Sequence, residues 1–266
     1  MTKISELAVV SKKAKISEGV EIGPYAIIED DVEISSRVKI WPHAHICSGT
    51  RIGEETEVHM GAVVGHLPQD LSFDCDIKTL TKIGKRTVIR EYATIHRSTK
   101  EGEATTIGDY CYLMAVSHVG HDCHVSNNVI LANGALLGGH VEVGDNSFIS
   151  GNVVVHQFCR IGDYCMIGGF SGINKDVPPY MLVRGPSVLR SVNLVALRRA
   201  KFPRDTIHKI MEAFKLLYHS NLNTSQAIDQ IKKLGQSLEL DHLIEFIRSS
   251  KRGICKYKYS DTEFFE

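Results

Sequence analysis

Six histidines occur between residues 96 and 156, and their spacing could bring several of them to one surface. They are His96, His118, His121, His124, His140 and His156. A neutral imidazole can act as a general base on a hydroxyl or an amine, or it can ligate Zn²⁺. Asp122 follows His121 directly and could fix the tautomer of its imidazole. Whether these side chains meet depends on the elements that carry them.

Those elements repeat with a period of six residues. At every sixth position from Val10 to Val64, and again from Ile107 to Ile173, the residue is Ile, Val or Leu. A period of six matches neither one face of a helix nor the alternation of a β-hairpin. It predicts short strands joined by turns, with three strands in each triangular coil of 18 residues. Like positions should then stack about 4.8 Å apart in parallel sheets, so we expect an all-β solenoid.

The predicted coil brings five of the polar residues together. His121, Gly139 and Gln157 are 18 residues apart and should form one column on three consecutive coils. His118 precedes His121 by three residues on the same side, and His140 lies one coil and one residue further on. These five residues should therefore converge on one strip of the surface.

Two histidines stand apart from that strip in the repeat. His96 and His156 share another phase and need not lie in the strip of the same subunit. Two chemistries remain open for the strip itself. One is general-base catalysis of acyl transfer, in which the Gly139 N–H would meet an oxyanion. The other is a zinc site like that of β-helical carbonic anhydrases, for which a glycine has no special use. A solenoid that is only a binding scaffold is a third possibility.

The position two residues before each inward aliphatic carries a small or β-branched residue. Four of the seven cysteines, Cys111, Cys123, Cys159 and Cys165, fall on it, which predicts that they are structural. Glycines such as Gly53, Gly120 and Gly138 directly follow an inward aliphatic, and we expect them in turns that need unusual φ angles.

Two interruptions and a change of period complete the predicted organisation. Residues 1–186 should form the β-helix, with loops near 65–82 and 97–106 that leave the prism, where irregular segments tend to carry function. Residues 187–266 should form a C-terminal α-helical domain. An amphipathic helix is expected from Asp205 to Tyr218, a second with Thr224 as N-cap that ends at Gly235, and a third around Leu243.

Composition excludes several classes of protein. Lys and Arg together number 31, as do Asp and Glu, so nothing indicates a nucleic-acid binder. There is no apolar run long enough for a membrane span, and the N-terminus lacks the pattern of a secretion signal. Seven cysteines without a CxxC pair favour reduced thiols, and we expect a cytoplasmic protein.

Several segments together closely resemble the UDP-N-acetylglucosamine acyltransferase family. They are IREYATIHR, SHVGHDC, LLGGH, VVVHQFCRIG and KDVPPY, with PQDL in the first loop, and the likeness extends through the tail. The resemblance implies a left-handed β-helix, a homotrimer with active sites between neighbouring prisms, and no cofactor or metal. It also implies transfer of an R-3-hydroxyacyl chain from acyl carrier protein to the 3-position of UDP-N-acetylglucosamine, the first step of lipid A synthesis.

The same resemblance assigns roles to individual residues. It implies that His121 is the general base with Asp122 as its partner, and that the Gly139 N–H binds the oxyanion. It implies substrate contacts from Gln69, Asp70, His96, His118, His140, Gln157, Asn193 and Arg199. Met166 and Gly169 match the pocket that measures the acyl chain.

The sequence departs from the family pattern at four positions. Ser72 replaces the usual lysine after QDL, Val195 replaces an acidic residue, Ala200 a basic residue and Ser187 a histidine. Some relatives use a sugar with a 3-amino group and form an amide, and the change at Ser72 keeps this alternative open.

Overall fold

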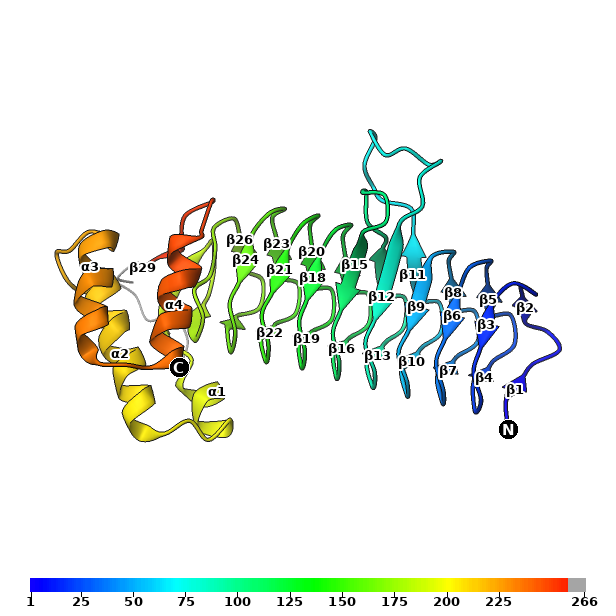
Figure 1. Cartoon of the computed structure of the whole chain (residues 1–266), viewed down its shortest axis with the longest axis horizontal. Helices are drawn as coiled ribbons and strands as arrows, with labels where there is room; N and C mark the ends of the chain where they lie inside the picture. Colours follow the sequence, from blue (N-terminus) through cyan, green and yellow to red (C-terminus); the bar gives the residue numbers. More distant parts are fainter. Residues whose placement is uncertain (258–266) are drawn as a thin grey trace.

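The computed structural model describes residues 1–257, in which most of the chain winds into a three-sided prism of stacked coils. Helices cover one end of the prism, and the N-terminus lies at the other (Figure 1). Each coil contributes a short strand to each of three sheets, and the strands of consecutive coils pair in parallel. The parallel β-helix predicted from the period of six is confirmed.

The first sheet extends from the N-terminal coil to the helical end. Its strands, in spatial order, are β1 (Lys3–Ile4), β4 (Glu21–Ile22), β7 (Lys39–Ile40), β10 (Glu57–Val58), β13 (Val88–Ile89), β16 (Tyr112–Leu113), β19 (Ile130–Leu131), β22 (Phe148–Ile149), β25 (Met166–Ile167), β27 (Met181–Val183), β28 (Val188–Val192) and β29 (Lys256–Tyr257).

The second and third sheets form the other two sides. The second contains β2 (Val9–Val10), β5 (Ile27–Ile28), β8 (His45–Ile46), β11 (Val63–His66), β14 (Thr94–His96), β17 (His118–Val119), β20 (Leu136–Leu137), β23 (Val154–Val155) and β26 (Gly172–Ile173). The third contains β3 (Lys15–Ile16), β6 (Glu33–Ile34), β9 (Thr50–Ile52), β12 (Leu80–Ile83), β15 (Ala104–Ile107), β18 (His124–Val125), β21 (Glu142–Val143) and β24 (Arg160–Ile161).

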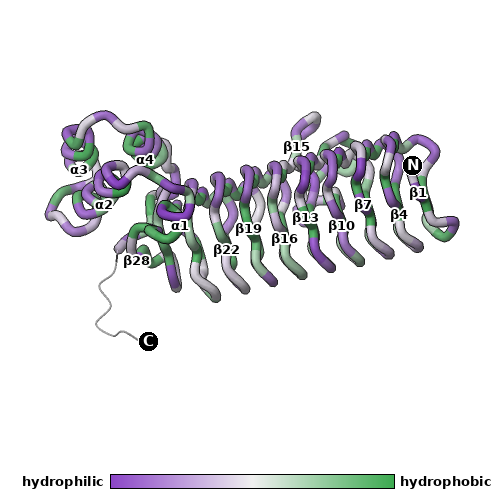
Figure 2. Tube along the Cα trace, turned by 90° about the horizontal axis from the view of Figure 1, so that it is seen from below, coloured by the Kyte–Doolittle hydropathy of each residue, from purple (hydrophilic) through white to green (hydrophobic). Residues whose placement is uncertain are grey.

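The interior consists of aliphatic ladders. The second residue of each two-residue strand points inward, so that Val119, Leu137 and Val155 stack in register and are buried. Hydrophobic and hydrophilic residues follow one another along the coils (Figure 2). The four cysteines on the small-residue position are also buried, as predicted. Each buried methylene contributes about 0.8 kcal/mol, so every aliphatic residue in these ladders stabilises the prism.

The glycines after the inward aliphatics are needed for a different reason than predicted. Gly53, Gly120 and Gly138 do not have positive φ, whereas non-glycine corner residues such as Asp122 and His140 do. A Cβ at Gly53 would lie 2.6 Å from the backbone of Gly84 in the next coil. Close approach between coils, rather than an unusual φ, therefore selects glycine here.

Both interruptions of the repeat leave the prism at the same edge, between the second and third sheets. Residues 67–79 connect β11 to β12, and residues 97–103 connect β14 to β15 (Figure 1). We call this edge, with its turns at residues 120–123, 138–141 and 156–159, the loop edge. It is the edge that carries His121 and Asp122.

Up to residue 257, the tail forms four α-helices: α1 (Leu194–Arg199), α2 (Arg204–Tyr218), α3 (Thr224–Ile231) and α4 (Leu238–Arg248). A 3-10 turn, Lys232–Leu234, continues α3 to Gly235, whose φ is +94°. The sequence pattern missed α1 because six residues are too few to show a helical period. Among residues 1–257 no helix has the length and apolar character that crossing a membrane requires.

The predicted N-cap of the second tail helix was wrong by one residue. Asn223 is the cap, and Thr224 is the first helical residue. The Asn223 side chain accepts a hydrogen bond from the Gln226 N–H at 3.0 Å, and the Gln226 side chain accepts one from the Asn223 N–H at 3.0 Å. This reciprocal capping box satisfies two backbone donors, which Thr224 alone could not.

The division of the chain after residue 186 remains a prediction. Strand β28 follows that point and pairs antiparallel with β27, so the residues after 186 begin with sheet before the helices start. Residues 258–266 of the predicted helical domain lie outside the described residues.

Candidate active site

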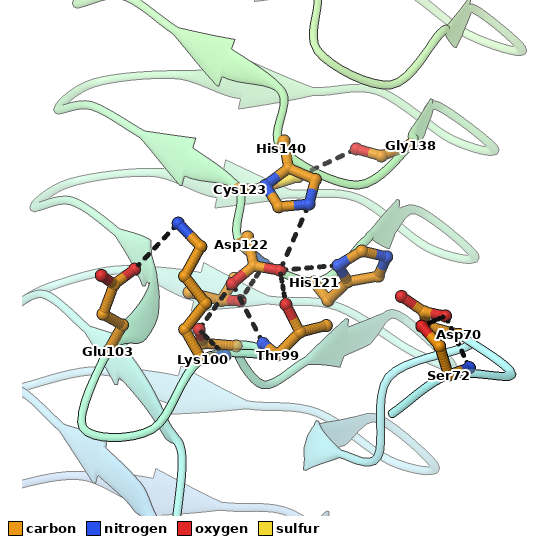
Figure 3. A network of polar contacts seen from close by, with 12 residues as sticks. Asp70, Ser72, Thr99, Lys100, Glu103, His121, Asp122, Cys123, Gly138 and His140 are labelled. Carbon is orange, nitrogen blue, oxygen red and sulfur yellow. Dashed lines mark hydrogen bonds and ion pairs between the residues drawn. The ribbon is translucent and has the colours of Figure 1, made fainter. Parts of the chain in front are cut away.

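His121 and Asp122 occupy a turn of the loop edge between β17 and β18. Asp122 has a φ of +59°, a left-handed conformation that Asp tolerates better than most residues. This backbone turns the carboxylate toward the imidazole, and His121 Nδ1 lies 2.7 Å from Asp122 Oδ2 (Figure 3). Two consecutive residues thus form a hydrogen-bonded pair.

The carboxylate of Asp122 is buried and receives hydrogen bonds on both oxygens. Oδ1 accepts from the Ser98 hydroxyl at 2.5 Å and the Thr99 N–H at 3.0 Å, and Oδ2 accepts from the Thr99 hydroxyl at 2.7 Å as well as from His121. Burial alone would raise the pKa of Asp122, but the bonds from Ser98, His121 and Thr99 outweigh it and lower the pKa to about 2. Asp122 is therefore an anion at neutral pH.

An ionised carboxylate can only accept hydrogen bonds, and this decides which His121 nitrogen carries the proton. In the neutral ring the hydrogen must sit on Nδ1, facing Asp122, and Nε2 keeps a free lone pair. Asp70 lies on the side of the His121 ring away from Asp122 (Figure 3). Nε2 can thus act as a base, and Asp122 can stabilise the imidazolium that results.

Gly139 packs directly against the imidazole of His121 from the next coil. A Cβ at Gly139 would lie 2.6 Å from both Cε1 and Nε2 of His121, so any side chain would displace the ring. Within residues 1–257 the Gly139 N–H donates to no other group. The predicted stacking of Gly139 on His121 is thus observed, and the Gly139 amide remains available as a donor beside the imidazole.

His121 and Gly139 line a cleft of about 370 Å³. Its walls also include His96, His118, Gln157 and Gln69. The register of β14, β17, β20 and β23 puts His96, Gly120, Gly138 and His156 in one column. The two glycines leave space between the two imidazoles, and that space is part of the cleft. The exposed side chains of Leu136 and Val154 give the cleft an apolar wall.

Two histidines of the cleft, His96 and His118, are held neutral by their surroundings. Burial, followed by the neighbouring His118, lowers the pKa of His96 to about 4, and burial also lowers the pKa of His118. His118 Nδ1 is hydrogen-bonded to the Thr94 hydroxyl at 2.8 Å, whereas the buried Nδ1 of His96 has no partner within residues 1–257. Neutral imidazoles suit hydroxyl groups of a ligand, since each can donate at one nitrogen and accept at the other.

His140 adjoins the pair from outside the cleft. Its ring meets that of His121 edge-on, with centroids 5.2 Å apart, and its Nε2 lies 3.6 Å from Asp122 Oδ2. Its other face stacks on Phe158 at 4.4 Å. His140 lines a neighbouring, larger depression with Lys100 and Asp122, so the predicted strip bends around the corner of the prism.

The first loop brings Asp70 and Ser72 to the site. The Ser72 N–H and hydroxyl both donate to Asp70 Oδ1, at 2.9 and 2.7 Å, and these bonds lower the pKa of Asp70. Ser72, the position where the family carries lysine, thus interacts with a predicted substrate contact.

Four predicted site residues lie elsewhere on the same chain. Asn193 caps α1, accepting from the Ala196 N–H, and Arg199 is exposed at the end of that helix. Met166 belongs to the first sheet, and Gly169 lies at the edge between the first and second sheets. None of the four lines the cleft of His121.

Sequence reasoning missed Ser98, Thr99 and the position of His156. The loop of residues 97–103 adds residues to one coil. His96 therefore lies one coil before Gly120, although 24 residues and not 18 separate them. Counting coils after removing this loop would have aligned His96 and His156. No pattern in the sequence indicated that Ser98 and Thr99 turn back onto Asp122.

His121, Asp122 and His140 also form a group that could hold a metal ion. A carboxylate has about four lone-pair sites, and the four hydrogen bonds to Asp122 fill them. A metal would have to break one of these bonds to bind the carboxylate. The geometry therefore favours a base–orienting pair over a catalytic zinc centre.

Family profiles match two parts of the chain. Residues 104–139 and 140–175 match the bacterial transferase hexapeptide family of six repeats, and residues 176–255 match domain 2 of the UDP-N-acetylglucosamine O-acyltransferase family. Two curated relatives are named acyl-[acyl-carrier-protein]–UDP-N-acetylglucosamine O-acyltransferase. That of Thermodesulfovibrio yellowstonii is 44% identical over 259 residues, covering 96% of this chain and 100% of the relative. That of Syntrophobacter fumaroxidans is 42% identical with the same coverage.

Solved structures agree with these relatives. A UDP-N-acetylglucosamine acyltransferase from Bacteroides fragilis has a TM-score of 0.91 and 39% identity, covering 94% of this chain and 98% of that chain. The Francisella novicida enzyme has a TM-score of 0.92 and 33% identity, covering 95% of this chain and 94% of that chain. The left-handed parallel β-helix with C-terminal helices, expected from the resemblance, is confirmed.

Proposed function

Because the chain belongs to the UDP-N-acetylglucosamine acyltransferase family, we propose that it moves an R-3-hydroxyacyl chain from acyl carrier protein to the 3-hydroxyl of UDP-N-acetylglucosamine, the first step of lipid A synthesis. The proposal rests on a contact between His121, whose imidazole is bound to a carboxylate, and Gly139, whose N–H has no acceptor among residues 1–257. This pair offers a base and an oxyanion donor at one point of a cleft, which is what acyl transfer requires.

The reaction proceeds through one tetrahedral intermediate. His121 Nε2 takes the proton of the sugar 3-hydroxyl as that oxygen attacks the thioester carbonyl of the acyl carrier. The Gly139 N–H donates to the resulting oxyanion. The intermediate then expels the carrier's thiolate, which receives the proton from the His121 imidazolium. Asp122 stays ionised throughout and stabilises that imidazolium, so proton and charge return to their starting state.

The remaining polar groups of the cleft suit the sugar nucleotide. The buried Nδ1 of His96, which has no hydrogen-bond partner in the described part of the chain, and the neutral His118 can bond sugar hydroxyls without a charge being buried. Gln69 and Gln157 line the same cleft and can bond hydroxyl or phosphate oxygens, and Asp70 lies beside it. This distribution supports the substrate contacts that the resemblance implies for these residues.

A homotrimer would reunite the predicted residues that one chain keeps apart. Asn193, Arg199, Met166 and Gly169 are remote from the cleft of their own chain, and they could reach that of a neighbour. The edge between the first and second sheets is also apolar and exposed. It presents, along the length of the prism, Leu7, Tyr25, Tyr92, Val116 and Phe170. Exposed large apolar side chains that recur along one edge favour a subunit interface there.

The acyl carrier is proposed to dock at a basic surface near α1. Arg198, Arg199, Lys201 and Arg204 are all exposed there. Positive charge at this place would attract an acidic carrier protein and raise the association rate. The acyl thioester at the end of the carrier's arm would enter the neighbouring cleft along its apolar wall.

The amide-forming variant of the reaction remains the second candidate because Ser72 stands where the family has lysine and bonds Asp70. Both candidates use the same base. A mass-spectrometric assay that offers the 3-hydroxyl and 3-amino sugar nucleotides, each with carrier-bound chains of several lengths, distinguishes them by product mass. We expect the 3-hydroxyl sugar to be preferred, and exclusive turnover of the amino sugar would reverse that assignment.

Replacement of the base tests the mechanism itself. His121→Ala should lower kcat by about 10²- to 10⁴-fold, the usual contribution of a general base. His124→Ala is a matched control, because His124 is exposed on the third sheet and outside the cleft. Near-normal turnover of His121→Ala in a correctly folded protein would refute the assignment.

A further inference from the structure

Cys47 is the one buried cysteine that neither the repeat nor a hydrogen bond explains. Five other buried thiols each donate to a backbone carbonyl, as Cys123 does to Gly138 at 3.0 Å and Cys165 to Pro178 at 3.1 Å. Cys47 is only 5% exposed, and within residues 1–257 its thiol has no acceptor. It also follows an inward aliphatic, Ile46, instead of preceding one. Its sulfur is thus a buried, unpartnered group on the loop edge.

Two other potential ligands surround this sulfur. The pairing of β5 with β8 sets Ile27 beside His45 and Ile28 beside Ile46, so Glu29 of one coil lies next to Cys47 of the following coil. His45 Nε2 is 2.8 Å from Glu29 Oε1. The ligand atoms of Glu29, His45 and Cys47 all lie within 4.8 Å of one another. Glu29 and His45 are partly exposed, which leaves solvent a route to the group.

From this arrangement we infer that Glu29, His45 and Cys47 form a binding site for a thiophilic divalent cation of the Zn²⁺ type, with solvent as the fourth ligand. A thiolate, an imidazole and a carboxylate from consecutive coils are the donor types that Zn²⁺ binds. Ligands around tetrahedral Zn²⁺ lie roughly 3.4 Å apart, so the contact between His45 and Glu29 must open by about 0.6 Å.

Charge and lone pairs permit this binding. Glu29 Oε1 faces His45, and Oε2 accepts a hydrogen bond from the Ser48 N–H at 2.9 Å, so each oxygen keeps a free lone pair. Asp122 differs in this respect, because its four sites are filled. On binding, the Cys47 thiol releases its proton to solvent, and the thiolate and the Glu29 carboxylate balance the charge of the cation. Burial, followed by the neighbouring Glu29, raises the pKa of the Cys47 thiol to about 12, and Arg97 offsets this only in part, so the cation itself must displace the thiol proton.

The cation would link the second and third coils at the edge that carries the catalytic turn. The Ser48 carbonyl, next to the site, receives a long contact of 3.5 Å from Arg97 Nη1, and Arg97 begins the loop that holds Asp122. The site is separate from the cleft of His121, since none of its three residues lines that cleft. Its expected role is structural.

Titration of metal-free protein with Co²⁺ tests the inference. Cobalt bound to a thiolate gives a sulfur-to-metal charge-transfer absorption in the near ultraviolet, whereas His121, Asp122 and His140 contain no sulfur and cannot produce it. We expect the band at one equivalent per chain in the unaltered protein. It should persist in Cys75→Ser, in which an exposed thiol is removed, and disappear in Cys47→Ser.

A second variant guards against misfolding of Cys47→Ser. His45→Gln changes a partly exposed side chain and should weaken Co²⁺ binding by at least about tenfold while the band keeps its position. Absence of the band in the unaltered protein, or an equal band in Cys47→Ser, would overturn the inference. The band is measured without an acyl-transfer assay, so its outcome is independent of the proposed function.

Discussion

Replacement of Asp122 by Asn should abolish most activity by reversing the tautomer of His121. The Thr99 N–H can only donate, so the amide oxygen of Asn must occupy the Oδ1 side, where it can accept from Thr99 and Ser98. The amide NH₂ then faces His121 Nδ1, which must become the acceptor. Nε2 consequently carries the hydrogen and has no lone pair with which to take a proton from the sugar.

The magnitude follows from two estimates. In the Ser-His-Asp triad, an Asp-to-Asn change that leaves the wrong tautomer costs about 10⁴-fold, and we expect a loss of kcat of about 10²- to 10⁴-fold here. The pKa of Asp122 falls from 3.8 to about 2 on folding, which corresponds to about 2 kcal/mol of stability at neutral pH. Because the folded pKa is the lower one, this stability is present above about pH 5 and is lost as the pH falls toward 2.

The assay combines turnover with unfolding. Initial rates with saturating sugar nucleotide and acyl carrier give kcat, and urea unfolding at pH 7 and pH 3 gives the stability difference between Asp122→Asn and the unaltered protein. That difference should shrink at pH 3. Thr99→Val is the matched control, since it removes one hydrogen bond to Oδ2 but keeps the charge and the tautomer, and it should lose about tenfold or less. A kcat of Asp122→Asn within tenfold of normal would refute the tautomer argument.

Three further changes test other parts of the site. Gly139→Ala should push the His121 ring by about 0.8 Å and lower kcat by about 10²-fold. Gly151→Ala is the control and should have nearly normal kcat, because its Cβ would meet its nearest neighbour at 3.4 Å. Equal rates of the two variants would contradict the packing argument. Arg199→Glu should raise the KM for the acyl carrier at low salt and leave the KM for the sugar nucleotide unchanged, as steady-state kinetics would show, and no change would remove the docking role. Ser72→Ala should remove the hydroxyl bond to Asp70 Oδ1, keep the bond from the backbone N–H, and alter the KM for the sugar nucleotide by a few-fold with little change in the rate of the chemical step. An effect on the single-turnover rate instead would place Ser72 closer to the chemistry.

The sequence alone determined the prism and the principal contact of the site. A strict period of six allows one regular arrangement of coils, in which residues 18 apart must stack. His121 and Gly139 are in contact for that reason. The burial of the cysteines on the small-residue position followed from the same periodicity.

The tertiary structure alone decided the surroundings of that contact, because irregular segments have no period from which to calculate a position. Ser98 and Thr99 leave the prism in a loop and return to Asp122, and Ser72 comes to Asp70 within another loop. Positions 120 and 138 require glycine because the next coil is so close, and not because of their own φ. The sequence of one strand does not reveal this distance. His96 and His156 share one cleft because the loop between residues 97 and 103 lengthens one coil without shifting its strands out of register.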